Sequence, residues 1–287
     1  MAVVRRVDYS VVESEFGAWE TALGQPDPRL APVIEVYHGY SESGTGLQRR
    51  LEVPFPRAAL ILGFGEEIAV SSSGYCEDLE PGYGGFLAGL TSVPALVESN
   101  GAQAGVQVDL TPLGAFHLFG VSMGDITNRV VRLRDLMGVA GDELIQRLRD
   151  APNWETRFEL LDRLFLRSLA TNRPPSEAIA WAWNQIRLHG GEVAIGELAD
   201  EIGWSHKHLI ARFRAEVGVA PRMAGRIIRF DRAVKRVAAG PPREMSAIAL
   251  ECGYYDQAHM VREFRSFARC TPREFRARQM PEGGTRG

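Results

Sequence analysis

Two short segments of this chain carry side chains of the types that bind nucleic-acid bases, at the spacing of outward positions on a helix. Glutamine and arginine can each form two parallel hydrogen bonds with a purine edge in the major groove, while isoleucine and alanine can only contact a thymine methyl group. A single arginine or glutamine on a helix is as often a plain surface residue, so the interpretation depends on the elements that hold these side chains. The base-facing candidates are His206, Lys207, Ile210, Ala211, Arg214, Gln257, Ala258 and Arg262.

A pattern that is written twice, about fifty residues apart, predicts these elements. In each copy apolar residues recur at the spacing of one helix face, a glycine follows as a turn, and a second apolar pair comes four residues apart. Ser205 and Asp256 can cap the second helix of each copy, because their side-chain oxygens accept from free N–H groups of the first turn. The sequence therefore predicts two helix-turn-helix motifs. Their apolar positions are Ile195, Leu198, Ala199, Ile202, Leu209 and Phe213 in one copy, and Met245, Ile248, Ala249, Cys252, Met260 and Phe264 in the other.

Residues 221–239, between the two copies, predict one amphipathic helix that begins near Pro221 and ends before Gly240, Pro241 and Pro242. Its apolar residues fall on one face, and five arginines, including Arg232, cluster opposite. A run of charged residues is usually a solvent-exposed face. This one lies between two predicted DNA-binding motifs, so contacts with DNA phosphates are expected. The phosphate candidates, weaker than the base-facing set, are Arg212, Arg222, Arg226, Arg229 and Arg236.

Residues 192–278 resemble the AraC/XylS family of transcription regulators over essentially the whole expected domain. The similar stretches read ELADEIGWSHKHLIARFRAEVGVAPRMAGRIIRFDRA and IALECGYYDQAHMVREFRSFARCTPREFRAR. The resemblance implies that the two outward helices enter successive major-groove segments on one side of the duplex, about 34 Å apart. Members often carry arginine where this chain has Ala211, so readout by the first helix is expected either to rest more on Lys207, Arg212 or Arg214 or to be weaker than usual. The positions that the resemblance makes base-facing are Lys207, Ile210, Ala211, Gln257, Ala258 and Arg262.

Charge is divided unevenly along the 287 residues. Residues 1–175 hold 15 basic and 23 acidic side chains, a net −8, whereas residues 176–287 hold 18 basic and 13 acidic, a net +5. A basic part joined to an acidic part is typical of a DNA-binding domain attached to one that avoids DNA. We therefore expect an amino-terminal domain over 1–170, a linker over 171–176, a DNA-binding domain over 177–280 and a flexible tail over 281–287.

The amino-terminal part predicts many short strands followed by helices, so the whole chain is expected to be α+β, with a small barrel or sandwich before an all-α domain. Gly, Pro and Ser clusters separate the strand-like segments. The strands are expected at 33–40, 47–53, 58–64, 68–71, 85–90, 94–98 and 105–110, and helical segments at 111–120, 122–127, 142–149 and 153–170.

The last of these helices carries a narrow apolar stripe of Trp154, Phe158, Leu161 and Phe165. Packing of the stripe onto its own barrel is the first interpretation, and a seam between two copies of the chain is the second. The stretches GVQVDLTPLGAFHLFGVSM and NWETRFELLDRLFLRSL resemble regulators whose amino-terminal half is a cupin-like barrel. That resemblance implies a domain that senses a small molecule or forms a dimer.

An effector site is not identified by residue. Aromatic residues on the strands would line a barrel pocket, but such residues are more often plain core. A metal-binding cupin needs two closely spaced histidines with a carboxylate and a further histidine, and this half has only His38 and His117, nearly eighty residues apart. We expect no metal and no cofactor. The aromatic candidates are Tyr37, Phe64, Tyr75 and Phe86.

Three functions stay open at this stage: an effector-controlled regulator of transcription, a DNA-binding regulator whose first half only dimerises or contacts another protein, and an enzyme fused to a DNA-binding domain. An alkyl-transfer repair protein would need a zinc-bound cysteine cluster, and residues 1–175 hold only Cys76. Cys252 and Cys270 show no metal-ligand spacing, and no serine or cysteine has an identifiable base, so no catalytic residue is proposed.

We expect a cytoplasmic, membrane-independent protein that binds double-stranded operator DNA, with a small-molecule effector, RNA polymerase and a second copy as further candidate partners. Activation and repression both stay open.

Overall fold

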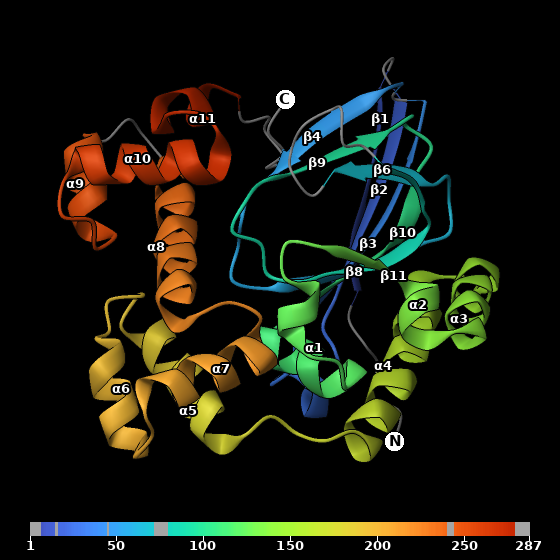
Figure 1. Ribbon diagram of the computed structural model, residues 1–287. Coiled ribbons are helices and arrows are strands. Elements are labelled where there is room, and N and C mark those ends of the chain that lie inside the picture. The colour runs from blue at the N-terminus through green and yellow to red at the C-terminus, as the bar shows by residue number, and fades with distance from the viewer. Residues whose placement is uncertain (1–6, 15–16, 45, 72–79, 240–243, 279–287) are drawn as a thin grey trace.

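The computed structural model describes the chain except for residues 1–6, 15–16, 45, 72–79, 240–243 and 279–287. Strands dominate the first half and helices the second, and the two halves lie side by side (Figure 1). The predicted fold class, a small β sandwich with helices followed by an all-α domain, is confirmed. Tyr75, Cys76, Gly240, Pro241, Pro242 and the tail at 281–287 lie outside the described residues.

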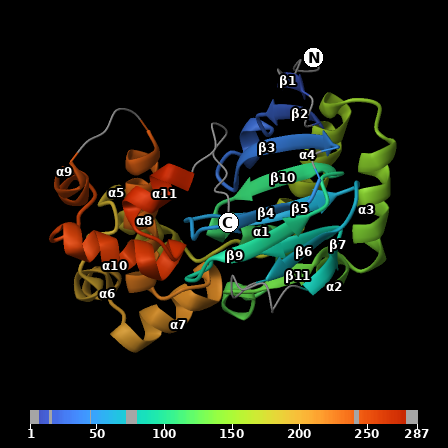
Figure 2. The same ribbon diagram turned by 90° about the horizontal axis from the view of Figure 1, so that it is seen from above.

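Two antiparallel sheets form the amino-terminal sandwich. The larger sheet has the strand order β1-β2-β3-β10-β5-β8-β11 and the smaller has β4-β9-β6-β7 (Figure 2). Each of the seven predicted strands coincides with one of these, while β1, β2, β7 and β11 were not predicted. The strands are β1 Val7–Ser14, β2 Gly17–Gly24, β3 Ile34–Ser43, β4 Gln48–Glu52, β5 Ala58–Gly63, β6 Ile68–Ser71, β7 Glu80–Tyr83, β8 Gly85–Ala88, β9 Ala95–Ser99, β10 Ala104–Leu110 and β11 Val130–Arg132.

The helices of the first half cover one face of the larger sheet. Thr111 caps α1, whose N-terminal Gly114 N–H donates to the threonine hydroxyl, and Gly120 ends it in the left-handed conformation. The first half contains the short 3-10 turns η1 Pro28–Leu30 and η3 Met123–Ile126, and the helices α1 Pro112–Phe119, α2 Leu133–Met137, α3 Val139–Asp150 and α4 Trp154–Thr171.

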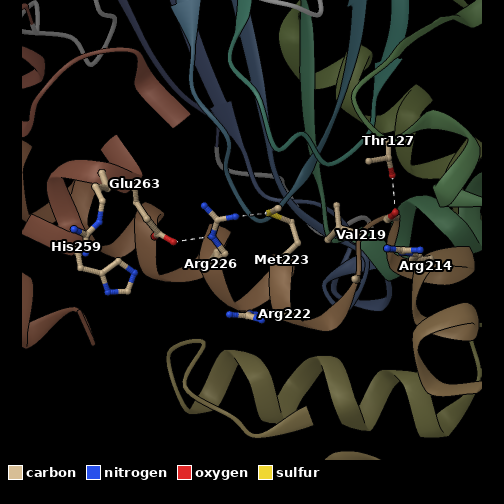
Figure 3. A pocket seen from close by; sticks show the side chains of 11 residues that line it. Thr127, Arg214, Val219, Arg222, Met223, Arg226, His259 and Glu263 are labelled. Atoms are coloured by element: carbon tan, nitrogen blue, oxygen red, sulfur yellow. Dashed lines mark hydrogen bonds and ion pairs between the residues drawn. The ribbon is translucent and has the colours of Figure 1, made fainter. Parts of the chain in front are cut away.

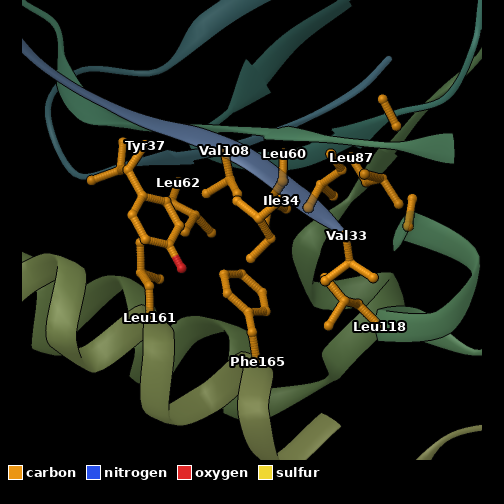
Figure 4. Close-up of a cluster of buried hydrophobic side chains, with 14 of the residues drawn as sticks. Val33, Ile34, Tyr37, Leu60, Leu62, Leu87, Val108, Leu118, Leu161 and Phe165 are labelled. Atoms are coloured by element: carbon orange, nitrogen blue, oxygen red, sulfur yellow. The ribbon is translucent and has the colours of Figure 1, made fainter. Parts of the chain in front are cut away.

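The apolar stripe of α4 is buried against its own sheet. The Tyr37 ring stacks on Phe158 with 5.3 Å between ring centroids. Leu161 and Phe165 point from α4 into the same core (Figure 4). Gly24 and Gly39 lie directly under the rings of Phe158 and Trp154, where a Cβ would collide. The stripe is therefore core, and the alternative of a dimer seam made by these residues is wrong.

The carboxyl-terminal half is built around one long helix, α8. The first half of α8 contributes Ile227 to one apolar cluster, and its second half contributes Phe230 to another. Each helix-turn-helix motif therefore packs on its own segment of α8. The helices here are α5 Glu177–Leu188, α6 Ile195–Ile202, α7 His206–Val217, α8 Pro221–Ala238, α9 Met245–Glu251, α10 Gln257–Ala268 and α11 Pro272–Arg278. None of the described helices is both long and apolar enough to cross a lipid bilayer.

The two halves touch at both motifs. Leu90 is buried within the cluster of the first motif, and the Thr127 hydroxyl donates to the Gly218 carbonyl at 2.7 Å. Gly218 has φ +108°, and an added Cβ would come within 2.9 Å of the Thr127 hydroxyl oxygen. The second motif receives Val53 from the end of β4. The amino-terminal half therefore contacts both motifs.

Candidate nucleic-acid interface

The first helix-turn-helix motif forms as its sequence pattern predicts. Gly203 takes the left-handed conformation at φ +74° and ends α6. The Ser205 side chain accepts from the His208 N–H at 3.3 Å and caps α7. Leu209 and Phe213 are fully buried, and the Trp183 ring of α5 lies 6.3 Å from that of Phe213. These contacts hold α7 by one side and leave the other side exposed.

The second motif repeats this construction with a more aromatic core. Gly253 has φ +80° in the turn after α9, and Asp256 caps α10 by accepting from the His259 N–H at 2.6 Å. The Phe264 ring meets Phe230 of α8 edge-to-face at 5.0 Å between centroids. We call α7 and α10 the reading helices from here on.

The base-facing candidates lie on the outer sides of the reading helices. Seven of the eight are exposed, and Ile210 is partly buried. No observation of this structure tests their contact with bases, so those assignments stay predictions. The exposed set is His206, Lys207, Ala211, Arg214, Gln257, Ala258 and Arg262.

The histidines of the motifs that were not assigned to bases serve in packing. The His208 ring meets Trp204 edge-on at 4.4 Å between centroids, and His259 meets Tyr254 edge-on at 5.2 Å. Each histidine thus covers the aromatic residue of its own turn. In the first half, His38 Nε2 lies 3.5 Å from Asp109 Oδ2. Across the described part of the chain, no group of three or more His, Cys, Asp or Glu is placed to hold a metal ion.

One cavity of about 630 Å³ is lined by residues of both reading helices (Figure 3). Arg214 of α7 and Arg262 of α10 both line it, with Arg222 and Arg226 of α8 between them. Thr127 of the amino-terminal half also lines it. Because residues of both helices border one hollow, the reading helices present their exposed arginines on a shared side of the molecule. We call this hollow the interhelical cavity.

The arginines predicted to contact phosphate are not one solvated stripe. Arg226 Nε donates to Glu263 Oε1 at 2.8 Å, and Arg229 Nη1 donates to the Gly191 carbonyl at 3.2 Å. Arg212 Nη2 donates to Glu216 Oε1 at 2.6 Å, which makes it a structural partner of its own helix. The arginines of α8 therefore do not share one open face, because α8 is covered by α10 and by the turn after α5, and their contact with phosphate stays a prediction.

The other two phosphate candidates, and the neighbouring Arg232, differ in their surroundings. Arg222 is exposed and lines the interhelical cavity. Arg236 Nε lies 3.7 Å from Glu251 Oε2, and Arg232 donates to the carbonyls of Gly190 and Glu251. Arg222 is therefore the arginine of α8 that is best placed for a phosphate.

Two buried glutamates that the sequence analysis did not identify anchor the reading helices. Glu216 is 1% exposed and accepts from Arg212 and from the Ser176 N–H at 2.8 Å. Glu263 is 3% exposed, pairs with Arg226, and has Arg229 Nη2 at 3.9 Å. A sequence signal exists, since each glutamate comes three residues after a buried apolar position of its helix, where a charge is unusual.

Burial affects the titration of the residue beside the second glutamate. Burial, and then the adjacent Glu263 carboxylate, raise the pKa of the Tyr254 phenol well above its ordinary value. Tyr254 therefore stays neutral and packs under α10 as a buried aromatic residue.

Of the aromatic residues that were considered for an effector pocket, the three that the structure describes, Tyr37, Phe64 and Phe86, pack in the core. Tyr37 is fully buried and its hydroxyl donates to Asp162 Oδ1 at 2.9 Å, and Phe86 is buried beside Tyr83. Phe64 packs beside Trp154. A smaller cavity of about 190 Å³ lies instead among the helices of the first half. Its lining is Leu118, Phe119, Leu136, Met137, Leu164, Phe165, Ser168 and Asn172.

Comparison with known proteins places a family match on the second half. Residues 198–278 match the family described as helix-turn-helix domain. A search of curated proteins found no significant match.

Solved structures with similarity to the chain include two that cover about a third of it and one that covers most of it. The carboxyl-terminal domain of AraT, a response regulator from Geobacillus stearothermophilus, is 19% identical, with 37% of this chain and 88% of that chain covered and a TM-score of 0.34. An AraC-type regulator from Chromobacterium violaceum is 23% identical, with 37% and 95% covered and a TM-score of 0.33. ToxT from Vibrio cholerae is 11% identical, with 81% and 97% covered and a TM-score of 0.45.

Proposed function

We propose that this chain, whose residues 198–278 form an AraC-type helix-turn-helix domain, regulates transcription by inserting both reading helices into one face of a double-stranded operator. The observation that supports this best is the interhelical cavity, because exposed Arg214 and Arg262 from the two motifs border the same hollow. Two helices that pack on one rigid helix, α8, can enter successive major-groove segments of a duplex.

Within this interface we assign base contacts to the exposed side chains of α7 and α10 and a phosphate contact to Arg222. Base contacts specify sequence, while phosphate contacts position the protein and supply salt-dependent affinity. Selection of duplexes from a random pool by the full-length chain tests the assignment. We expect two short conserved elements whose centres are about one helical turn apart. Enrichment of no common sequence would contradict sequence-specific binding.

Genome-wide mapping of bound sites in the source cells would test the regulatory role. We expect occupied sites upstream of transcription units, each with the same paired element. Occupancy spread evenly over the chromosome would contradict a regulator of particular genes.

We further propose that a small molecule controls the protein through the cavity among α1, α2 and α4. This cavity is lined mainly by apolar side chains, with Ser168 and Asn172 as its polar groups. Asn172 follows α4 directly and its side-chain amide donates to the Leu118 carbonyl of α1 at 2.7 Å. Helix α1 also contacts the reading helix α7. A small apolar ligand here would therefore touch the link between the two halves.

Thermal melting of the full-length chain against a library of small apolar acids, alcohols and aromatics tests this control. A true effector raises the melting temperature and changes the affinity for the selected duplex. Ser168→Leu, which fills the cavity, should abolish both effects. If no compound shifts either quantity, the alternative is favoured, in which the amino-terminal half serves only a second copy of the chain or RNA polymerase.

A further inference from the structure

Glu263 is a buried carboxylate that borders the interhelical cavity and holds one of its arginines. The Glu263 side chain is 4% exposed and that of Arg226 is 32% exposed, and their Nε and Oε1 atoms lie 2.8 Å apart. Figure 3 shows this ion pair, with Arg226 extending from α8 toward α10. Arg226 thus bonds to a buried anion and also lines the interhelical cavity.

A second arginine lies behind the first. Arg229 is 17% exposed, and its Nη2 lies 3.9 Å from the same Glu263 oxygen. Within the described residues, Glu263 Oε2, Arg229 Nε and the Tyr254 hydroxyl are all buried without a hydrogen-bond partner, and the Tyr254 phenol interacts with the Glu263 carboxylate. A buried carboxylate oxygen without a donor is unfavourable, so a small shift that joins it to Arg229 or to the neutral Tyr254 hydroxyl would be favoured, and of these two only Arg229 carries a compensating charge. Arg229 can therefore keep Glu263 neutralised if Arg226 leaves.

The charge of the cavity favours an anion at Arg226. Its lining holds four arginines and one glutamate, and Arg214 and Arg262 belong to the two reading helices. In the DNA-binding arrangement proposed above, a DNA strand that passes from one reading helix to the other would cross this hollow and bring its phosphates to it. A phosphate there would compete with the Glu263 carboxylate for the same guanidinium group.

We propose that Glu263 and DNA compete for Arg226: a phosphate entering the interhelical cavity takes over Arg226, and Arg229 alone then compensates Glu263. This inference rests on the DNA-binding function proposed above. Glu263 is accordingly an affinity-setting residue, since each DNA contact at this point must first break an internal ion pair. The position before it, Arg262, carries a base-facing candidate, so the competition takes place beside a point of sequence readout.

Glu263→Gln in the full-length chain tests the competition. Binding is measured at fixed salt to a duplex selected by the wild-type chain and to a scrambled duplex of the same composition. We expect about five- to tenfold tighter binding to both duplexes, because Arg226 is released from a charge-assisted hydrogen bond. Arg226→Ala should weaken binding and lower the salt slope by about one phosphate contact.

The double variant Glu263→Gln with Arg226→Ala decides between competition and simple repulsion. If Glu263 acts only by taking up Arg226, then Glu263→Gln has no effect on binding once Arg226 is absent. Equal tightening with and without Arg226 would mean that removal of any negative charge near DNA suffices, and would overturn the proposal. The double variant carries neutral Gln at position 263, so it leaves no buried charge without a partner when Arg226 is absent. It is therefore expected to stay folded even where Arg226→Ala alone does not, which thermal melting checks.

Glu216→Gln is the matched control. Glu216 is an equally buried carboxylate on the other reading helix, but it bonds to Arg212 and to the Ser176 N–H and does not line the cavity. We expect less tightening from this variant than from Glu263→Gln, because the Arg212 side chain that it releases does not line the cavity. An equal gain would contradict a specific role for Glu263. If the wild-type chain binds no duplex, the proposed function fails as well; if the wild-type chain binds and Glu263→Gln does not tighten binding, only the competition fails.

Discussion

The two helix-turn-helix motifs share an apolar pattern but differ in the polar contacts that anchor their reading helices. In the first, Glu216 ties α7 to the start of α5, directly after the linker, and Thr127 ties the end of α7 to the amino-terminal half. In the second, Glu263 ties α10 to the arginines of α8. The first reading helix is thus anchored to α5 and to the amino-terminal half, and the second to the arginines of α8. A repeated pattern therefore specifies two similar shapes without specifying equal roles.

The largest expected difference between the motifs concerns how far the structure is loosened around an aromatic core residue when that residue is replaced by alanine. Phe264→Ala removes a ring that packs on Phe230 and Phe275, and should cost about 3–5 kcal/mol of unfolding free energy. Amide hydrogen exchange should increase from α9 to α11, should change only slightly near Val53, which is partly buried against this cluster, and should stay slow in the rest of the sandwich. Phe213→Ala should cost a similar amount, but its exchange should also rise near Leu90, which belongs to the same cluster. Equal spread in both variants would remove the distinction.

A smaller effect is expected from the glycine at the junction of the halves. Gly218→Ala must place a side chain at φ +108° and within 2.9 Å of the Thr127 hydroxyl oxygen, so we expect a loss of about 2–3 kcal/mol. Gly203→Ala is the matched control, because Gly203 is also left-handed but its Cβ would meet no atom within 4 Å. It should cost about 1 kcal/mol. Denaturant unfolding measures both, and equal losses would show that the contact with Thr127 contributes nothing.

The base-reading and phosphate-binding roles can be separated on DNA. Arg262→Ala should cost about 1–3 kcal/mol on the selected duplex and relax preference at one base position. Arg222→Ala should weaken all duplexes alike and lower the salt slope by about one. Titrations over a salt series on selected and scrambled duplexes measure this. Uniform weakening by Arg262→Ala would place that residue among the phosphate contacts.

The smallest expected effects come from the helix caps. Asp256→Ala and Ser205→Ala should each cost about 1 kcal/mol of stability, because each side chain satisfies one free N–H of a reading helix. The Asp256 bond is 2.6 Å long and carries a charge, while the Ser205 bond is 3.3 Å long, so Asp256→Ala should be the more damaging. Thermal melting gives the order, and the reverse order would show that the second motif does not depend more on its cap.

Local patterns in the sequence were sufficient for most elements of both halves. The seven predicted strands and both motifs were found because alternation, helical spacing, capping residues and turn glycines act within a few residues of one another. The strands β1 and β2 were missed because their residues do not alternate clearly: Tyr9 and the adjacent Val11 and Val12 are exposed. Strand β11, Val130–Arg132, is too short to give a periodic signal.

The candidate interface was predictable as a pair of helix faces but not as a set of partners. The outward positions of α7 and α10 follow from the buried pairs on the same helices. The partners of Arg226 and Arg229 do not follow, because they depend on Glu263, more than thirty residues away along the chain. A helical projection of α8 alone shows arginines opposite an apolar face, and it cannot show that α10 covers part of that face.

By itself, the sequence determined that this chain has a β-rich half and a helical half, and that the helical half carries two capped helix-turn-helix motifs. Those properties depend on hydrophobic spacing and backbone conformation within one or two turns. Only the tertiary structure decided that the stripe of α4 is core, that both reading helices border one cavity, and that Glu216 and Glu263 anchor them differently. Burial and ion pairing are set by distances between segments far apart in the chain, and no local pattern specifies those distances.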